Sequence, residues 1–180
     1  MNQSSFLIAV FSFAILLAMG LLFLYLHLRS VREEAVGYWK IILDKMRIRN
    51  DMMPGLIETV RKYTGKDSGE EKLLGELIAL RAKSWPMEHA TGQKVNVELR
   101  LTQELHAVWK LPQRFSALNV DTNFLSLKKD FHDLGKEIDA MVDVYNKKVR
   151  GFNGGLGLLV MRPFLAVAGL KKLAIFEFEV

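Results

Sequence analysis

The stretch that decides the fold is VGYWKIILDKMRIRNDMMPGLIETV, residues 36–60. Its apolar positions recur in alternating steps of three and four residues, with Asn50 at one of them: Val36, Trp39, Leu43, Met46, Asn50, Met53, Ile57 and Val60. This spacing is typical of a helix that packs one face against other helices. Pro54 lacks an amide hydrogen and Asp51 can cap a restarting helix, so we expect a kink or short break there. Such a break would expose Asn50, which is the favoured interpretation; the alternative is a buried polar group that fixes register.

Ahead of this helix, residues 6–28 read FLIAVFSFAILLAMGLLFLYLHL. As a helix they would be about 34 Å long, enough to cross a hydrocarbon core of about 30 Å. None of the 25 basic and 20 acidic residues precedes Arg29. A cleaved signal peptide would need basic residues before a shorter apolar run and a small-residue cleavage site, and this sequence has neither. We therefore predict a retained transmembrane anchor.

The flanks of this segment predict its orientation. Six basic residues follow it closely: Arg29, Arg32, Lys40, Lys45, Arg47 and Arg49. The positive-inside rule then places the N-terminus outside and the rest of the chain in the cytoplasm, in a single-pass topology. We expect Arg29 and Arg32 to hold the juxtamembrane helix against anionic headgroups. Ala14 and Ala18 form one small-xxx-small pair; this leaves homo-oligomerisation open, although a plain anchor is favoured.

Further helical patterns follow residue 60. Residues 64–71 predict a loop in which Ser68 and Glu71 have capping-box spacing. Whether residues 70–110 form one bent helix or two stays open, because Trp85-Pro86 and Thr91-Gly92 interrupt the pattern. A last helix is predicted from Asp121, as N-cap, to the stop signal Asn153-Gly154-Gly155. Its apolar positions again alternate by three and four: Phe124, Leu127, Phe131, Leu134, Ile138, Met141 and Tyr145, continued by Val149 and Phe152.

These patterns together predict an all-α protein. Long amphipathic helices joined by short loops must bury their apolar faces against each other, and an antiparallel bundle of three to four long helices does so. We expect a transmembrane anchor at 1–28, a helical bundle at 29–153 and an apolar C-terminal tail at 154–180.

The tail has two parts. Residues 156–170, LGLLVMRPFLAVAGL, are too short and interrupted to span a membrane, so they either cover the bundle or lie in the interface with Lys171 and Lys172 on headgroups. In the closing AIFEFEV, an extended backbone would place Phe176 and Phe178 on one face. We expect this part to pack along the bundle, and docking of a partner by strand addition is the alternative. Phe164, Phe176 and Phe178 are the candidate interaction residues.

Several blocks resemble the LemA family. RNDMMPGLIETVRKY (49–63) is similar to the run that ends that family's first helix, with Arg49, Asp51, Pro54, Leu56 and Val60 at the motif positions. FSALNVDTNFLSLKKDFHDLGKEI (115–138) resembles its phenylalanine-rich third segment. DVYNKKVRGFN (143–153), with Tyr145 and Asn146, is similar to its doubled tyrosine–asparagine repeat. IFEFEV resembles its closing aromatic–glutamate tail.

The sequence also departs from the family pattern. Phe152-Asn153 replaces the second tyrosine–asparagine, an arginine is missing just before Tyr145, and a glutamate is missing before Pro112. Such departures are typical of a divergent branch, of which magnetosome-associated LemA-like proteins are one. The resemblance implies a membrane-anchored helical bundle with no established enzymatic activity.

The sequence has no motif that predicts catalysis. There is no cysteine, and His27, His89, His106 and His132 lack the partners of a metal motif. The glycines after Asn153 follow a helix and lack the lysine of a phosphate loop. We therefore predict no catalytic, cofactor-binding or metal-binding residue, no cofactor, and a non-enzymatic protein; an unrecognised polar site is the enzyme alternative.

The net charge of +5 and the pI near 9.4 fit either an anionic partner or plain solubility. On a tethered domain the nearest such partner is the headgroup layer. Nucleic acid is disfavoured, because basic and acidic residues alternate along the helices and no nucleic-acid motif is present. The leading hypothesis is a scaffold or interaction module that binds an unidentified protein at the membrane. A signal-transmitting module, coupled through the junction of anchor and helix, is the alternative.

Overall fold

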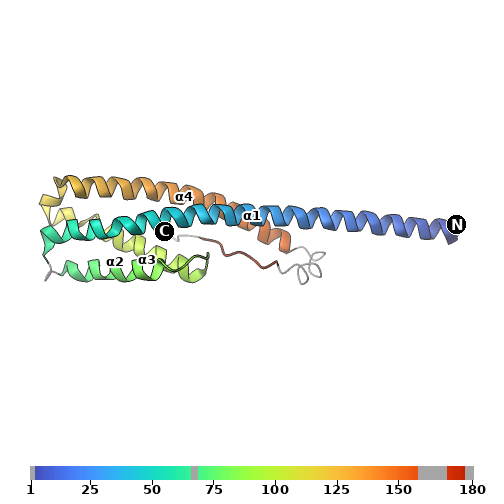
Figure 1. Cartoon of the computed structure of the whole chain (residues 1–180), viewed down its shortest axis with the longest axis horizontal. Helices are drawn as coiled ribbons and strands as arrows, with labels where there is room; N and C mark the ends of the chain where they lie inside the picture. Colours follow the sequence, from blue (N-terminus) through green and yellow to red (C-terminus); the bar gives the residue numbers. More distant parts are fainter. Residues whose placement is uncertain (1–2, 66–68, 158–169, 177–180) are drawn as a thin grey trace. The chain divides into compact units, whose positions relative to one another are not determined.

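The computed structural model describes residues 3–65, 69–157 and 170–176 of the chain. Its elements are α1 (Gln3–Thr64), α2 (Glu70–Ser84), α3 (Gly92–Val108), the short 3-10 helices η1 (Leu111–Gln113) and η2 (Ser116–Asn119), and α4 (Thr122–Leu156) (Figure 1). These residues contain helices and no strand. The predicted all-α helical bundle is confirmed.

The chain divides into two compact units, residues 38–146 with 174–180 and residues 1–37 with 147–173. In the larger unit the second half of α1 lies between α4 and the α2–α3 pair, and successive helices run antiparallel (Figure 1). A core of apolar side chains from all four helices and from η1 and η2 holds this unit together: Met53, Leu56, Ile57, Val60, Leu74, Leu77, Leu80, Leu101, Leu105, Val108, Leu111, Leu118, Phe124 and Phe131.

The periodic pattern of residues 36–60 defines the buried face of α1. Seven of its eight positions are buried, and Val36 is half-buried. Asn50 is 1% exposed, so the interpretation that a break would expose it is wrong. The helix continues through Pro54, and Asp51 lies within it instead of capping a new one. The helix stays continuous because a side chain of α2 donates a hydrogen bond to the α1 backbone near Pro54, as described below.

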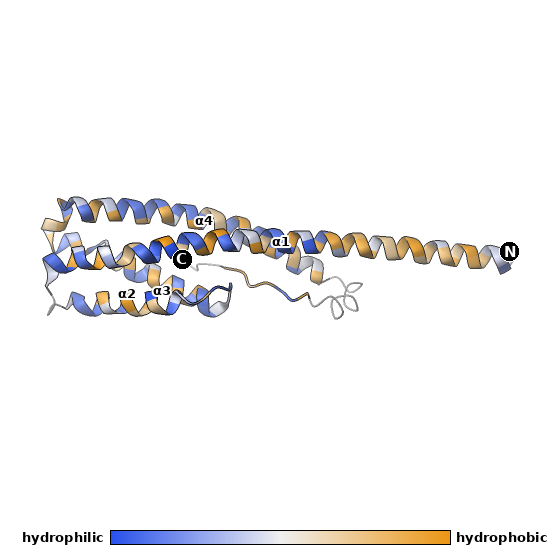
Figure 2. Ribbon diagram, in the orientation of Figure 1, coloured by the Kyte–Doolittle hydropathy of each residue, from blue (hydrophilic) through white to orange (hydrophobic). Residues whose placement is uncertain are grey.

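The first part of α1 is apolar along its whole circumference (Figure 2). It contains a stretch that is long and apolar enough to span a membrane, and its most apolar window is 0% buried. Exposed side chains there include Phe11, Phe13 and Phe23, each at least 68% exposed.

The structure also places the other predicted boundaries. Residues 70–110 form two helices, and the Thr91 side chain accepts a hydrogen bond from the Lys94 amide at the start of α3. Asp121 caps α4 as predicted, since its Oδ1 accepts from the Phe124 amide at 2.7 Å. The predicted stop at residues 153–155 is slightly early, because α4 continues to Leu156. Ser68 lies outside the described residues.

Candidate functional site

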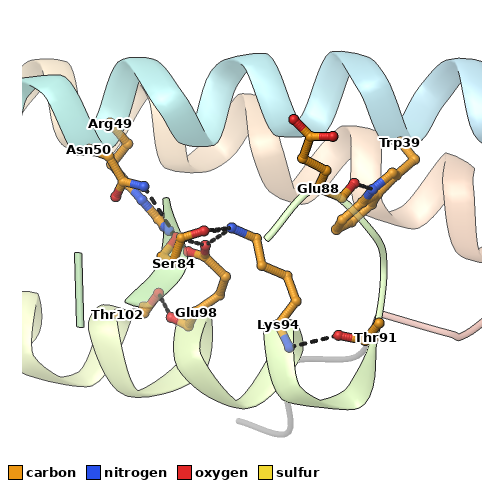
Figure 3. A network of polar contacts seen from close by, with 9 residues as sticks. All are labelled: Trp39, Arg49, Asn50, Ser84, Glu88, Thr91, Lys94, Glu98 and Thr102. Atoms are coloured by element: carbon orange, nitrogen blue, oxygen red, sulfur yellow. Dashed lines mark hydrogen bonds and ion pairs between the residues drawn. The ribbon is translucent and has the colours of Figure 1, made fainter. Parts of the chain in front are cut away.

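A network of buried polar side chains joins α1, α2 and α3 (Figure 3). Glu98 of α3 is fully buried and forms ion pairs with Arg49 of α1 and, over 2.6 Å, with Lys94 of α3. Ser84, at the end of α2, donates to Glu98 and accepts from Asn50 Nδ2 at 3.2 Å and from Lys94 Nζ at 2.9 Å. The helices are therefore joined through one carboxylate and one hydroxyl.

The hydrogen-bonding capacity of this network is almost fully used within the protein. Lys94 Nζ has three donors, and it contacts Glu98, the Ser84 hydroxyl and, at 3.0 Å, the Ser84 carbonyl. The Ser84 hydroxyl uses its single proton and both lone pairs. Among the described residues, Arg49 Nε and Asn50 Oδ1 are buried side-chain atoms with no hydrogen-bond partner. Three protein donors, from Arg49, Lys94 and Ser84, contact the two oxygens of the Glu98 carboxylate, and such a connected arrangement favours one register of the helices.

The charges in this network keep Glu98 ionised. Burial by itself raises the pKa of the Glu98 carboxyl, but the positive charges of Arg49 and Lys94 and the hydrogen bonds from Lys94 and Ser84 outweigh burial, so the pKa is lowered from its ordinary value. Asp139, an exposed residue of α4, also interacts electrostatically with Arg49.

Pro54 and Arg81 explain why α1 does not break. In a helix the residue 50 carbonyl accepts from the residue 54 amide, and proline has no such hydrogen. Arg81 of α2 supplies the missing donor, because its Nε lies 2.6 Å from the Asn50 carbonyl oxygen. The Arg81 Nη2 atom lies 4.0 Å from Asp51 Oδ1, and the Arg81 guanidinium lies over the Trp85 ring. The motif residues Asp51 and Pro54 therefore form, with Arg81, a junction between α1 and α2.

The remaining positions of this motif lie in the core. Leu56 and Val60 are completely buried in the α1 face that contacts the other helices. Tyr63, one turn later, donates from its hydroxyl to Asp121 Oδ2 at 2.6 Å, and this bond raises the pKa of Tyr63 and lowers that of Asp121.

The described part of the tail is held by two asparagine side chains of α4. Asn146 accepts from the Phe176 amide at 2.8 Å and donates to the Phe176 carbonyl at 2.6 Å. Asn153 makes the same pair of bonds with Leu173, at 3.0 and 2.9 Å. Each asparagine thus binds both backbone groups of one tail residue. We call the pair of Asn146 and Phe176, which lies in the larger unit, the asparagine clasp.

Aromatic side chains in the larger unit complete the attachment of the tail. Phe176 is fully buried, with its ring centroid 5.3 Å from that of Trp39. Tyr145 packs on the same Trp39 ring and donates to the Ala174 carbonyl at 2.8 Å; burial raises the pKa of Tyr145 to about 12. Trp39 in turn donates to the Glu88 carbonyl at 2.7 Å (Figure 3). Trp39 is therefore a core residue, as its position on the seam predicted.

The structure places the other predicted residues as follows. Arg29 and Arg32 are exposed, and Arg29 pairs with Glu33 one turn away. Phe164 and Phe178 lie outside the described residues. All four histidines are exposed. Within the described ranges no group of three or more His, Asp or Glu side chains is placed to hold a metal ion.

Sequence reasoning missed the buried network of Ser84, Lys94 and Glu98. A signal for two of them exists, because Lys94 and Glu98 continue the helical stripe of Leu101, Leu105 and Val108 in steps of four and three. Charged residues on the buried stripe of a helix are rarely left without partners. Nothing in the spacing indicates Ser84 or Arg81, since their partners lie on another helix.

Comparison with known proteins agrees with the blocks described above. No curated protein matches the chain. A model of the LemA family matches residues 38–180, which include the Arg49–Val60 motif, the asparagine clasp and the tail. The match is to the family as a whole and does not single out the magnetosome-associated branch. With most of its length matched in this way, the chain belongs to the LemA family.

Proposed function

We propose that this protein is a membrane-anchored, non-enzymatic interaction module, in which the helical bundle is held at the membrane surface as a scaffold for a protein partner. One observation supports this above all. The apolar first part of α1 has no buried residue in its most apolar window, yet it continues without a break into the seam of the bundle. So many large apolar side chains are unfavourable in water and favourable in a bilayer.

The topology in this proposal is a single pass with the N-terminus outside. The bundle is then cytoplasmic, because every basic residue follows the apolar segment. Single cysteines at Asn2 and Gly69 test this orientation in a chain that has no native cysteine. Gly69 is exposed and has room for a side chain. Labelling of Gly69→Cys by an impermeant reagent added outside intact cells would overturn it.

A partner surface in this proposal is the outer face of α1. Ile41 and Ile48 are 45% and 52% exposed and lie seven residues apart, so they occupy the same face of the helix. Exposed apolar side chains of this kind are available to a partner helix.

Crosslinking in membranes followed by purification of the complex tests the partner surface. The double variant Ile41→Ser/Ile48→Ser should lose a specific crosslinked product while it remains in the carbonate-resistant membrane fraction. Ile78→Ser, a control of similar exposure on α2, should retain the product. If both variants retain it, the partner does not bind this face; if the wild type is extracted by carbonate, the anchor itself is wrong.

A second candidate is a signal-transmitting module. The continuity of α1 from Gln3 to Thr64 favours it, because a rigid helix can transmit a shift or rotation from the membrane to the bundle. Two glycines inserted between Ser30 and Val31 distinguish the candidates. A scaffold should keep its crosslinked product after this insertion. In a signal-coupled protein, the bundle should no longer respond to a shift or rotation of the membrane segment.

A further inference from the structure

The smaller unit brings together three segments that are distant in sequence. Leu28 of α1 is buried with Phe152 and Leu156 of α4, and Leu170 and Leu173 of the tail pack against them. Gly155 makes this approach close, because a Cβ at that position would overlap the Leu28 side chain. The end of α4 and the start of the described tail therefore lie against the last turns of the apolar segment of α1.

The length of α1 sets the depth of this cluster in a membrane. Residues 6–20 alone would rise about 22 Å, which is too short for a hydrocarbon core of about 30 Å. Residues 6–25 rise about 30 Å and match it. Leu21 and Leu24 belong to this second range, and both pack against the cluster of Leu28, Phe152 and Leu156. A bilayer that covers α1 to residue 25 therefore also reaches this cluster.

Charged residues on the three segments stop at the edge of the same cluster. On α1 the first is Arg29, and on α4 none lies between Arg150 and the helix end at Leu156. In the tail, Leu170 is followed directly by Lys171 and Lys172, which are both exposed. Long basic side chains at an apolar boundary can extend to headgroups while their stems stay in the apolar layer.

The tail is held beside the end of α4. Asn153 binds both the amide and the carbonyl of Leu173, and Leu173 follows directly after Lys172. The two lysines are therefore held next to the last turn of α4, at the edge of the cluster.

We propose that two parts of the smaller unit are inserted into the membrane beside α1. They are the end of α4, Gly154–Gly157, and the tail residue Leu170, which packs against the cluster. Lys171 and Lys172 then bind the headgroups of anionic phospholipids. We call this region the membrane corner. This proposal rests on the proposed anchor. It adds a second element, partly inserted in the bilayer, to the membrane contact made by α1.

The absence of cysteine and the placement of the glycines allow a direct test by spin labelling. A Cβ at Gly20, Gly37, Gly151 or Gly154 would have no heavy atom within 4 Å, and one at Gly157 would lie 3.1 Å from the Gly154 carbonyl oxygen. Each glycine is replaced singly by cysteine in the full chain and labelled. The protein is then reconstituted in nanodiscs of phosphatidylcholine with phosphatidylglycerol. Collision with oxygen, against collision with a water-soluble nickel chelate, measures the depth of each label.

The expected depth decreases in the order Gly20, Gly157, Gly154 and Gly151, with Gly37 fully in water. If the labels at Gly157 and Gly154 match Gly37 while Gly20 lies in hydrocarbon, the membrane corner is wrong and the anchor stands. If Gly20 also contacts the nickel chelate, the anchor is wrong as well.

The headgroup part is tested with Lys171→Gln/Lys172→Gln against the matched control Lys128→Gln/Lys129→Gln, whose lysines are exposed on α4 in the larger unit. The probe is the ratio of phosphatidylglycerol to phosphatidylcholine that remains bound to the protein in native mass spectrometry of the nanodiscs. We expect the tail variant to lower this ratio by about fivefold or more and the control to leave it unchanged. An unchanged ratio in the tail variant, or an equal fall in the control, would overturn binding of anionic lipid by Lys171 and Lys172.

Discussion

At the scale of single residues, the buried charges decide how the bundle is held together. Arg49, Lys94 and Glu98 come from two helices and are at most 7% exposed as side chains. Desolvation of such groups offsets most of their attraction, so an intact network contributes more to a unique helix arrangement than to net stability. Removal of one charged member of the network lowers stability, because it leaves the remaining charges buried with fewer ion-pair partners.

Glu98→Gln removes the only negative charge of this network. Lys94 would then lose its ion pair, and Arg49 would keep only its interaction with the exposed Asp139, so we expect the free energy of unfolding to fall by about 3–5 kcal/mol. Chemical denaturation followed by circular dichroism measures this. Glu104→Gln on the same helix is the control, since Glu104 lies beside Glu76 and its removal relieves repulsion. A fall of similar size in both variants would contradict the assignment to the network.

The lowered pKa of Glu98 also predicts how stability depends on pH. A carboxyl whose folded pKa lies below its ordinary value of 4.5 contributes stability above that value, and the contribution is lost as pH falls through the folded pKa. We expect a constant free energy of unfolding down to about pH 5 and a decline below it, which should be shallower in Glu98→Gln. Asp121, with a lowered pKa as well, contributes to the same decline in both proteins. Equal slopes for wild type and variant would show that Glu98 is not responsible.

At the scale of elements, α1 owes its continuity to α2. Pro54 leaves the Asn50 carbonyl without its helical donor, and Arg81 replaces that donor from the neighbouring helix. The proline therefore makes α1 depend on the helix that packs beside it, which isolated helix propensity does not describe.

A double-mutant cycle tests this dependence. Arg81→Met should destabilise the wild type by about 1–3 kcal/mol, because the Asn50 carbonyl loses its partner. In Pro54→Ala the residue 54 amide can donate instead, so the same Arg81→Met change should cost about 1 kcal/mol less. Pro54 is exposed, so the alanine fits without repacking. Additive effects in urea denaturation would mean that Arg81 does not substitute for the missing amide.

The asparagine clasp is the second device at this scale. Asn146→Ala removes both hydrogen bonds to Phe176, and we expect a loss of about 2 kcal/mol and faster hydrogen exchange at the Phe176 amide. Asn123→Ala, at an exposed position on the same helix, is the control. If exchange at Phe176 does not change, the clasp does not hold the tail.

At the scale of the whole molecule, the described end of the tail is part of the core of the larger unit. Phe176 contacts Trp39 across 137 positions of sequence, and Tyr145 binds the Ala174 backbone. Removal of the tail would therefore expose Trp39, so a deletion mixes loss of a partner site with loss of core.

A substitution separates these effects. Phe176→Ala should lower the free energy of unfolding by about 3–5 kcal/mol, since a fully buried phenylalanine leaves a cavity. Ile175→Ala, at a neighbouring side chain that is 38% exposed, should cost far less. Thermal unfolding of both variants checks this; equal losses would mean that Phe176 is not part of the core.

Local patterns in the sequence determine the helices and the apolar segment. The three-four spacing of residues 36–60 and 124–145, the cap at Asp121 and the uncharged residues 6–28 act over one or a few turns, so they can be read without knowing what packs where. The family blocks identify Arg49, Asp51, Pro54, Tyr145 and Asn146 as positions that matter, but not why.

The tertiary structure alone decides what these polar residues do. Asn50 is buried instead of exposed because Ser84 lies opposite it, and Pro54 does not break α1 because Arg81 reaches the free carbonyl. Asn146 and Asn153 bind a tail some 20 to 30 positions away. Each outcome depends on a partner from a distant part of the chain, and a hydrogen bond is specified by the position of both its groups, which periodicity cannot supply.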